Sequence, residues 1–487
     1  MSAIPELARA ADVTEWARSA DVVIVGYGIA GACAALEAQG TGAEVLVLER
    51  ASGGGGASAL STGIFYLGGG TPVQKAFGYD DKAEDMFKFL MASTGARDPV
   101  LVREFCDNAV AHFGWLEAQG VPFERTYHKE KVVRPTTSEC LCSTGNEKLW
   151  PYSEIAEPMP RGHKVACAGD GAGAVMMQAL LARCDEAGIV PLCDTNVTAL
   201  VADADGRIVG VLARRLGETF AVKARRGVIV ACGGFTMNNE MLLEYAPQVT
   251  KGPVRPLGTP YNDGAGIRLG QSAGAATQAM DGVIATASFY PPGQLVKGIL
   301  VNARGARFVA EDSYHGRTAD FVMEQPGGKA YLIVDSEIFA YPEMTAAKHR
   351  LVDGWETVAE MEAGLKLPEG SLQATLAAYN RHAETGSDPL FFKHKDWLKP
   401  LTAGPFAAFD VSFDSSVYAF LTLGGLKATV RGEVLHEDGH VIPGLFAAGA
   451  CVSSIPLDGK GYASGLSLAP GSYFGRLAGR AAAGATQ

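Results

Sequence analysis

The sequence has no long apolar run and no excess of positive charge. No apolar stretch reaches the roughly 20 residues that a membrane-spanning helix needs, and the N-terminal segment lacks the basic and apolar regions of a signal peptide. Lysine and arginine number 42 against 53 acidic residues, so the net charge is −11. This balance argues against partners such as nucleic acid or an anionic membrane surface. We therefore expect a soluble cytoplasmic protein without a membrane span.

The nine cysteines show no spacing typical of a metal or haem site. Cys140 and Cys142 form a C-x-C pair, which offers too few ligands for zinc without partners nearby. The sequence has no C-x-x-C-H motif and no iron–sulfur cysteine run. We expect reduced thiols and no bound metal. Electrons from any redox reaction must then leave to an external acceptor, which the sequence does not identify.

Glycine, in contrast, is abundant. The 487 residues include 60 glycines, well above the usual share of about 7%. They cluster beside apolar strands instead of forming a linker, which indicates backbone packed against a large cofactor. The length is enough for two or three domains, or for one large domain with an insertion.

The clearest motif lies near the N-terminus. An apolar strand is predicted over 22–25, a G-x-G-x-x-G turn and an alanine-rich helix follow, and a second apolar strand over 45–48 ends at Glu49. In this pattern the glycines permit a tight turn, close approach to a pyrophosphate and close helix packing, while the acid accepts ribose hydroxyls. The pattern predicts a dinucleotide-binding unit, and an ordinary glycine-rich turn is the alternative. The predicted cofactor contacts are Gly26, Gly28, Ile29, Ala30, Gly31 and Glu49.

A second glycine run follows the acid directly. Four glycines over 53–56 precede several hydroxyl side chains, and such a loop presents N–H and O–H groups to anionic oxygens. A nicotinamide dehydrogenase does not need this loop, whereas a large, buried FAD does; the alternative is a solvent loop. The predicted FAD contacts here are Arg50, Ala51, Gly56, Ala57, Ser58, Ser61, Thr62 and Gly63.

Between residues 80 and 276, the spacing of apolar residues and the local composition predict further helices and strands. Helices are expected over 82–93, 99–119, 176–187 and 267–273, and short strands over 190–192, 196–203, 208–214 and 220–224. We expect the four strands to form a small antiparallel sheet of their own. A further apolar strand over 228–231 leads into a glycine pair. Predicted cofactor contacts in this part are Val197, Ala231, Gly233 and Asp263, the last as a helix cap.

Residues from about 277 to 414 differ in texture, with more aromatic residues and prolines and fewer β–α signals. Helices are expected there near 336–339, 357–365 and 371–382. The earlier style then returns, with a strand over 445–448 and a last helix over 468–483. We predict an α/β fold with a Rossmann-like FAD-binding domain formed by 1–276 and 415–487, and an inserted α+β capping domain over 277–414.

Six motifs in order resemble the FAD-dependent fumarate reductase and succinate dehydrogenase flavoprotein superfamily, which includes the 3-ketosteroid dehydrogenases. They are GYGIAG with Glu49, GGGGAS, ACGGF, NDGAG, TLGGL and PGLFAAG. The resemblance implies a FAD domain built from both ends of the chain, with a substrate-capping domain between. It also implies FAD contacts at Gly449, Ala450, Gly465, Ser467 and Leu468. The loop GGGGASAL lacks the histidine that carries covalent flavin in some members, so we expect non-covalent FAD.

The C-terminal motif separates the branches of this superfamily. Fumarate reductases read R-L-G-G-N-A-L there, and the arginine holds a substrate carboxylate; this chain has Tyr462 in that place. A phenol cannot supply the charge-assisted bonds that a dicarboxylate needs, but it can donate a hydrogen bond to a ketone. The motif therefore favours an uncharged carbonyl substrate.

The motif GYASG, together with EDSYHGR over 311–317, is most similar to the 3-ketosteroid Δ4-(5α)-dehydrogenases. The resemblance implies Tyr314, Tyr462 and Ser464 as catalytic residues. It implies proton abstraction at C4 of a 3-ketosteroid and hydride transfer from C5 to flavin N5, which introduces a C4–C5 double bond. Tyr462, or N–H groups around Gly461, would polarise the C3 ketone. Either Ser464 or Tyr314 would accept the proton, with a relay to solvent and an optimum above neutral pH.

A flat, apolar substrate favours aromatic walls. Candidate substrate contacts are Tyr66, Phe289, Tyr290, Phe420 and Gly461. One departure from the family is Lys460, which replaces the first of two glycines before the tyrosine. Arg317 is expected to pair with Asp312 or Glu311, in a structural or a functional role.

Three alternative functions stay open at this point. A 3-ketosteroid Δ1-dehydrogenase differs only in which carbons face the flavin. A flavin-dependent reductase of an enone or of a fumarate-type acid would run the opposite way. A flavin-carrying binding or electron-transfer subunit would bind FAD without reacting with a substrate.

Overall fold

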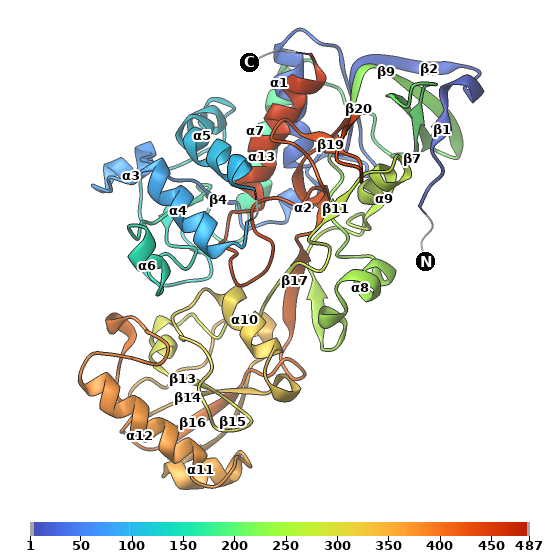
Figure 1. The fold of residues 1–487 in the computed structure, drawn as a ribbon. Helices are drawn as coiled ribbons and strands as arrows, with labels where there is room; N and C mark the ends of the chain where they lie inside the picture. Colours follow the sequence, from blue (N-terminus) through green and yellow to red (C-terminus); the bar gives the residue numbers. More distant parts are fainter. Residues whose placement is uncertain (1–3, 97, 485–487) are drawn as a thin grey trace.

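The computed structural model describes residues 4–96 and 98–484. Figure 1 shows a larger body that contains both ends of the chain and a smaller body formed by residues from the middle of the sequence. The helix labelled α10 and the strand β17 lie between the two bodies. None of the helices in the described part combines the length and the apolar character needed to cross a membrane.

Within the described residues, an eight-stranded sheet forms the centre of the larger body, in the order β1-β7-β8-β9-β2-β3 with β20 and β19 added beside β9. β2 pairs in parallel with both β3 and β9, so Val25 lies beside Leu48 and beside Val230. The strands are β1 (Ala8–Arg9), β2 (Trp16–Val25), β3 (Val45–Leu48), β7 (Thr195–Ala202), β8 (Ile208–Arg215), β9 (Glu218–Val230), β19 (Glu433–Leu435) and β20 (Val441–Ala447).

The prediction of a separate small antiparallel sheet is wrong. β9 is one continuous strand that pairs antiparallel with β8 over 218–223 and parallel with β20 over 228–230. It joins the predicted strands 220–224 and 228–231, because β2, β8 and β20 pair along it. Arg225, in the middle, forms ion pairs with Asp21 and Glu44. The expected strand over 190–192 reduces to an isolated bridge between Leu48 and Leu192.

Two helices from opposite ends of the chain pack together on this sheet. α1 (Ile29–Gly40) and α13 (Leu468–Ala482) lie side by side in Figure 1, one blue and one red. A Cβ atom added at Gly475 would lie 2.6 Å from the carbonyl oxygen of Ala30, and one at Gly479 would overlap Ala34. Small residues therefore let the two backbones touch, and the last helix completes the dinucleotide-binding unit begun by the first.

Other helices and strands of the larger body agree closely with the predicted bounds. α4, α5 and α9 match the helices expected over 82–93, 99–119 and 267–273, while α7 begins four residues before the expected start at 176. The elements are α2 (Gly56–Ala59), α3 (Pro72–Ala76), α4 (Ala83–Ser93), α5 (Pro99–Ala118), α6 (Tyr152–Ile155), α7 (Ala172–Glu186), α8 (Asn239–Tyr245), α9 (Ala265–Ser272), β4 (Ile64–Tyr66), β5 (Leu141–Cys142) and β6 (Gly162–Lys164).

The smaller body is built on a four-stranded antiparallel sheet in the order β13-β14-β16-β15, with α11 and α12 packed below it in Figure 1. The expected helices 357–365 and 371–382 correspond to α11 and α12. The helix expected at 336–339 is wrong: the chain turns there, and Ile338 N donates to Asp335 O at 3.3 Å. The elements are β13 (Ile299–Asn302), α10 (His315–Met323), β14 (Ala330–Val334), β15 (Arg350–Trp355), α11 (Val358–Gly364), α12 (Ser371–Glu384) and β16 (Phe406–Asp410).

Short ladders connect the two bodies. β17 (Tyr418–Thr422) lies between β10 (Val254–Pro256) and β12 (Val283–Thr286), and β11 (Thr277–Gln278) pairs with β18 (Gly425–Leu426). The chain therefore leaves and re-enters the larger body along paired strands. The exact domain limits 1–276, 277–414 and 415–487 stay a prediction.

Candidate active site

The G-x-G-x-x-G turn between β2 and α1 is packed backbone against backbone. Gly26 has φ of +103°, and a Cβ atom added there would lie 2.6 Å from the carbonyl oxygen of Ala231. A Cβ atom at Gly31 would overlap the carbonyl of Gly26. Gly449, with φ of +77°, approaches the same turn, because its added Cβ would lie 2.8 Å from Ala30. The structure thus brings predicted contacts from three distant segments to one helix N-terminus.

Glu49 ends β3 with its carboxylate beside this turn. It is buried, and its two oxygens accept hydrogen bonds from Tyr27 N at 2.7 Å and from Ala51 N at 2.8 Å. An ionised carboxylate accepts at about four lone-pair positions. Glu49 therefore keeps free acceptor capacity for ribose hydroxyls while the backbone fixes its orientation.

The second glycine run folds back onto the first. Ser58 Oγ accepts from Ile29 N at 3.2 Å, and Ser61 donates to Ser58 O at 2.7 Å. Arg50 donates to Asp263 at 2.6 Å, and the same carboxylate accepts from Ala265 N at 3.1 Å. The predicted contacts Gly56, Ala57 and Ser58 lie on α2, Thr62 and Gly63 follow it, and Val197 and Gly233 lie on β7 and just after β9.

A cavity opens where the end of β20 meets the start of α13. Its walls include the predicted contacts Gly449, Ala450 and Ser467, together with Leu423 and Phe474. Gly465 has φ of +103°, and a Cβ atom there would overlap the backbone of Tyr66 in β4. The cavity therefore lies beside the start of α13, and its walls combine small residues with apolar side chains.

Tyr314 and Ser464 meet at the junction of the two bodies. Tyr314 precedes α10, Ser464 precedes α13, and their hydroxyl oxygens lie 3.0 Å apart. The backbone holds both residues: Tyr314 N donates to Asn146 Oδ1 at 2.8 Å, and Ser464 N donates to Thr144 O at 3.0 Å. Both residues are thus anchored to the same segment, 144–146.

Tyr462 lies beside this pair. Its ring centroid is 6.2 Å from that of Tyr314, and its hydroxyl is 2.8 Å from Ser467 Oγ. Burial raises the pKa of Tyr314 well above its ordinary value, and the neighbouring Tyr462 adds to the shift, while the bond to Ser464 opposes it. Burial also raises the pKa of Tyr462. The site therefore holds two neutral phenols and two hydroxyl side chains, arranged to donate hydrogen bonds and to move a proton.

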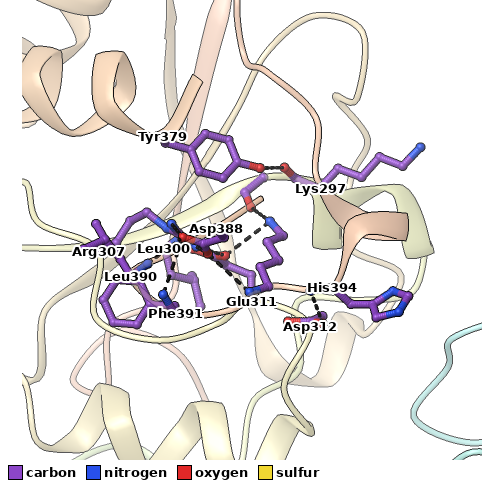
Figure 2. Close-up of polar contacts among 12 residues, drawn as sticks. Lys297, Leu300, Arg307, Glu311, Asp312, Tyr379, Asp388, Leu390, Phe391 and His394 are labelled. Atoms are coloured by element: carbon purple, nitrogen blue, oxygen red, sulfur yellow. Dashed lines mark hydrogen bonds and ion pairs between the residues drawn. The ribbon is translucent and has the colours of Figure 1, made fainter. Parts of the chain in front are cut away.

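A buried group of charges fixes the loop that carries Tyr314. Figure 2 shows Arg307 with its two carboxylate partners, Glu311 and Asp388. Arg307 donates to Glu311 at 2.8 and 2.9 Å and to Asp388 at 2.9 and 3.1 Å, and Lys393 lies 3.2 Å from Glu311. Burial alone would raise the pKa of Glu311, but Arg307 and Lys393 hold that pKa below its ordinary value. The expected pairing of Arg317 with Glu311 or Asp312 is wrong: Arg317 donates to Tyr152 Oη at 3.1 Å.

A second cavity borders Tyr314 on the side of the smaller body. Tyr290 and Trp397 form aromatic walls, and Lys131 and Asp312 contribute charged groups. Lys131 donates to Asp312 O at 2.8 Å, and burial lowers the pKa of this lysine. Tyr290, a predicted substrate contact, therefore lines a cavity next to Tyr314. Its contact with a substrate stays a prediction.

The other predicted substrate contacts do not line either cavity. Tyr66 is fully buried and donates to Glu147 at 2.9 Å, and Phe289 and Phe420 are buried in the core. Gly461 N donates to Asp458 at 2.9 Å, and a side chain at this position would overlap Ser93. Lys460 points away from the site and pairs with Glu324 on the surface at 2.5 Å.

Comparisons with known proteins agree with this arrangement. The model of the FAD binding domain family matches residues 21–459. The chain belongs to the FAD binding domain family. It is 30% identical to 3-oxo-5-alpha-steroid 4-dehydrogenase of Comamonas testosteroni over 90% of this chain and 94% of that protein. It is 28% identical to urocanate reductase of Eggerthella lenta, over 88% of this chain and 69% of that protein.

A solved structure is similar over nearly the full length. The crystal structure of 3-ketosteroid-Δ4-(5α)-dehydrogenase from Rhodococcus jostii RHA1, in complex with 4-androstene-3,17-dione, has a TM-score of 0.92 and 42% identity. The similarity covers 99% of this chain and 100% of that one. As a member of the FAD binding domain family, the protein is an FAD-dependent oxidoreductase, and the predicted α/β fold with a Rossmann-like FAD-binding part is confirmed.

The residues of this family member fit FAD. Gly26 and Gly31 pack against backbone with no room for a side chain, which keeps the turn before α1 tight. Glu49 offers free acceptor positions for ribose hydroxyls, and the recess at Gly449 and Ser467 has small residues in its walls. No sequence pattern pointed to Asn146 or Thr144, because they lie in an irregular segment without periodicity. Only the fold brings them to Tyr314 and Ser464.

Proposed function

We propose that this protein dehydrogenates a 3-ketosteroid and introduces a C4–C5 double bond. The hydroxyl pair of Tyr314 and Ser464, 3.0 Å apart and buried beside Tyr462, carries the proposal. The names of the similar proteins from Comamonas testosteroni and Rhodococcus jostii describe this reaction or its steroid, which supports the same substrate class here.

In this proposal, Tyr462 donates a hydrogen bond to the C3 ketone. This polarisation acidifies the neighbouring C4–H bond, because negative charge develops on the oxygen as the proton leaves. The Tyr314–Ser464 pair accepts the C4 proton and passes it toward the cavity next to Tyr314. Glu49 and the turn Gly26–Gly31 would hold FAD, which would supply the oxidising power for loss of the C5 hydride. The residues of the chain bind, orient and move the proton.

A dicarboxylate substrate is disfavoured by the same geometry. Position 462 carries a phenol, and Lys460 is already paired with Glu324. Lys131, in the cavity beside Tyr314, already donates to Asp312 O at 2.8 Å. Two carboxylates would need charge-assisted donors in the site. An uncharged ketone needs only a neutral donor, which Tyr462 supplies.

Two further parts of the proposal concern where the protein is located and which molecule accepts its electrons. All nine cysteines are free thiols, which suits a reducing cytoplasm. The reduced flavin must be reoxidised by an external acceptor, since the sequence contains no haem-attachment or iron–sulfur motif. We propose a cytoplasmic protein that hands its electrons to a separate carrier.

Anaerobic stopped-flow absorbance tests the proposed reaction. The yellow holoprotein is mixed with 5α-androstane-3,17-dione, with 4-androstene-3,17-dione and, with its flavin reduced beforehand, with fumarate. We expect rapid bleaching by the 5α-steroid and formation of the Δ4-enone, detected by its ultraviolet absorbance.

Other outcomes contradict the proposal in different ways. Bleaching by 4-androstene-3,17-dione, with a Δ1,4-dienone as product, assigns the chemistry to Δ1-dehydrogenation. Reoxidation of reduced flavin by fumarate or an enone, without bleaching by any saturated steroid, makes the protein a reductase. Bound FAD that reacts with none of these compounds makes it a binding or electron-transfer subunit.

A further inference from the structure

The hairpin between β19 and β20 has two histidines and an aspartate in H-x-D-x-H order, at positions 436, 438 and 440. The backbone fixes this turn, because His436 N donates to His440 O at 2.8 Å and Gly439 N donates to His436 O at 2.8 Å. His436 and His440 are thus opposite each other at the two ends of the turn, next to the last residue of β19 and the first residue of β20. Cross-strand pairs place their side chains on one face.

The side chains converge as this pairing requires. The two imidazole rings are stacked, with centroids 4.6 Å apart and planes inclined by 21°. Asp438, at the tip of the turn, places Oδ2 3.2 Å from His436 Nδ1. The same nitrogen accepts a hydrogen bond from Asp438 N at 3.1 Å, which an ion at Nδ1 would replace. One ligand atom from each of the three residues lies within 4.8 Å of the other two.

These separations suit a common ion. Two ligand atoms bonded to one tetrahedral ion at roughly 2.1 Å are about 3.4 Å apart. The Asp438–His436 separation already matches this value. The ligand atom of His440 lies within 4.8 Å of the other two, and its side chain is exposed.

The body of the protein also holds the first ligand in place. His436 lies against Gly274, where a Cβ atom would overlap the imidazole ring, and Glu437 N donates to Gly274 O at 3.0 Å. His436 is only partly exposed, with a side-chain accessibility of 29%, whereas that of Asp438 is 81%. One ligand is therefore positioned in advance, and the other two are open to an ion from solvent.

We propose that His436, Asp438 and His440 bind one divalent late transition-metal ion on the surface of the FAD-binding body. Two imidazoles and one carboxylate favour Cu²⁺, Ni²⁺ or Zn²⁺ over Mg²⁺ or Ca²⁺, which prefer oxygen ligands. The remaining coordination positions are left to water. The three residues lie outside the linings of both cavities of the active site, so the ion has no part in the proposed oxidation.

Binding has a structural consequence for the hairpin. The ion would link the tip of the turn to both strands, and β20 continues directly into Gly449 at the FAD cradle. An ion that binds the folded state and not the unfolded chain raises the melting temperature with its concentration. The site would therefore act as a clamp at the start of the strand that leads to the cofactor.

Calorimetric titration of the chelator-treated holoprotein with Ni²⁺ and Zn²⁺ tests the site. We expect one saturable site per chain, and a Cu²⁺ electron paramagnetic resonance spectrum with hyperfine coupling from two nitrogens. His440→Ala should weaken binding at least ten-fold, and Asp438→Asn should weaken it several-fold.

His382→Ala provides a matched control, because it removes another histidine, at the end of α12, and should bind the metal as the unchanged protein does. Flavin absorbance checks that each variant is folded. The proposal is overturned by the absence of saturable binding, or by binding in His440→Ala and Asp438→Asn as tight as in the unchanged protein. Loss of binding in His382→Ala would place the ion elsewhere.

Discussion

At the scale of single residues, the site depends on two hydroxyl groups that are 150 positions apart in the chain and 3.0 Å apart in space. Phenols titrate near pH 10 and alcohols far above, so Tyr314 and Ser464 are both neutral at pH 7. A neutral hydroxyl group is a weak base, and neither residue alone is a strong proton acceptor. Their contact makes a relay, in which one oxygen releases its proton as the other receives one. The segment 144–146 holds both residues by backbone hydrogen bonds.

Removing either hydroxyl should interrupt this relay. We expect Tyr314→Phe and Ser464→Ala each to lower the rate constant of flavin reduction by about 10²–10⁴-fold, the usual share of a proton-transfer group. The double variant should be little worse than the single ones, because the two groups act as a unit. Stopped-flow reduction measures the rate, and steroid-induced changes in the flavin spectrum measure binding. Tyr331→Phe, on β14, is the control, and full additivity of the two losses would contradict the relay.

The reduction rate should rise with pH. Burial raises the pKa of Tyr314, so the phenol stays protonated at neutral pH and must pass a proton on for each one it receives. A lower proton concentration in solvent favours this release. We expect the rate constant to increase from pH 6 to pH 9, and the dependence to flatten in Tyr314→Phe. A rate that falls over this range would contradict proton release through Tyr314.

At the scale of elements, the loop before α10 and the loop before α13 carry the three proposed catalytic side chains. The first loop is tied down by a buried group of charges. Arg307, Glu311 and Asp388 are seen in Figure 2, and Lys393 pairs with Glu311 at 3.2 Å. A buried cation between two carboxylates is expensive to remove. Without Arg307, Asp388 loses its cationic partner and Glu311 keeps only Lys393.

Arg307→Met should therefore destabilise the holoprotein by about 3–5 kcal/mol, measured by urea unfolding. The matched control is Arg304→Met, at an exposed position in the same turn. The pKa values of Glu311 and Asp388 are lower in the folded protein than in the unfolded chain. The stabilisation that these carboxylates provide is therefore complete above their ordinary pKa values. It is lost as the pH falls through their lowered pKa values. The difference between unchanged protein and Arg307→Met should shrink in acid. A constant difference from pH 7 to pH 3 would contradict this.

α10 also carries a buried carboxyl group that faces the loop before Tyr462. Burial, with Asp458 nearby, raises the pKa of Asp320 to about 8. The folded state therefore favours the neutral acid, and stability should fall as pH rises from about 4 to above 8. We expect the free energy of unfolding of Asp320→Asn to exceed that of the unchanged protein by about 2 kcal/mol or more at pH 9, and by little at pH 4. Thermal unfolding across this range measures the effect, and equal slopes for both proteins would contradict it.

At the scale of the whole molecule, FAD binding joins segments that are far apart in sequence. The proposed cradle combines the turn at Gly26–Gly31, the loop after β9 and the segment at Gly449, and α13 packs on α1. A cofactor that contacts all of them should stabilise the larger body as a unit, because it binds only when they are assembled.

Removal of FAD should therefore lower the melting temperature, and re-addition should restore it with rising FAD concentration. At a free FAD concentration of 100 times Kd, the free energy of unfolding should increase by about 2.7 kcal/mol. Acid precipitation should leave all yellow colour in the supernatant, because the loop over 53–60 contains no histidine to attach the flavin. Differential scanning fluorimetry and absorbance of the supernatant measure the two effects. Colour retained in the pellet would contradict non-covalent binding.

The sequence by itself determined the FAD-binding fold and its principal helices. Glycine spacing near Gly26 and the acid at Glu49 are local features, because a tight turn and a strand end depend on residues within a short stretch. The helix over 99–119 has regular amphipathic spacing and is found at α5. Tyr314, Tyr462 and Ser464 were indicated by resemblance to a family, and the structure brings them together.

Only the tertiary structure decided what depends on long-range pairing. The residues of β9 form one strand because β2, β8 and β20 pair along it, which no local pattern reveals. Phe289 and Phe420 are as apolar as cavity residues, and only packing places them in the core. Asn146 holds Tyr314 from an irregular segment. A side chain's chemistry is fixed by its sequence position, but its partners are set by segments that meet only when the chain has folded.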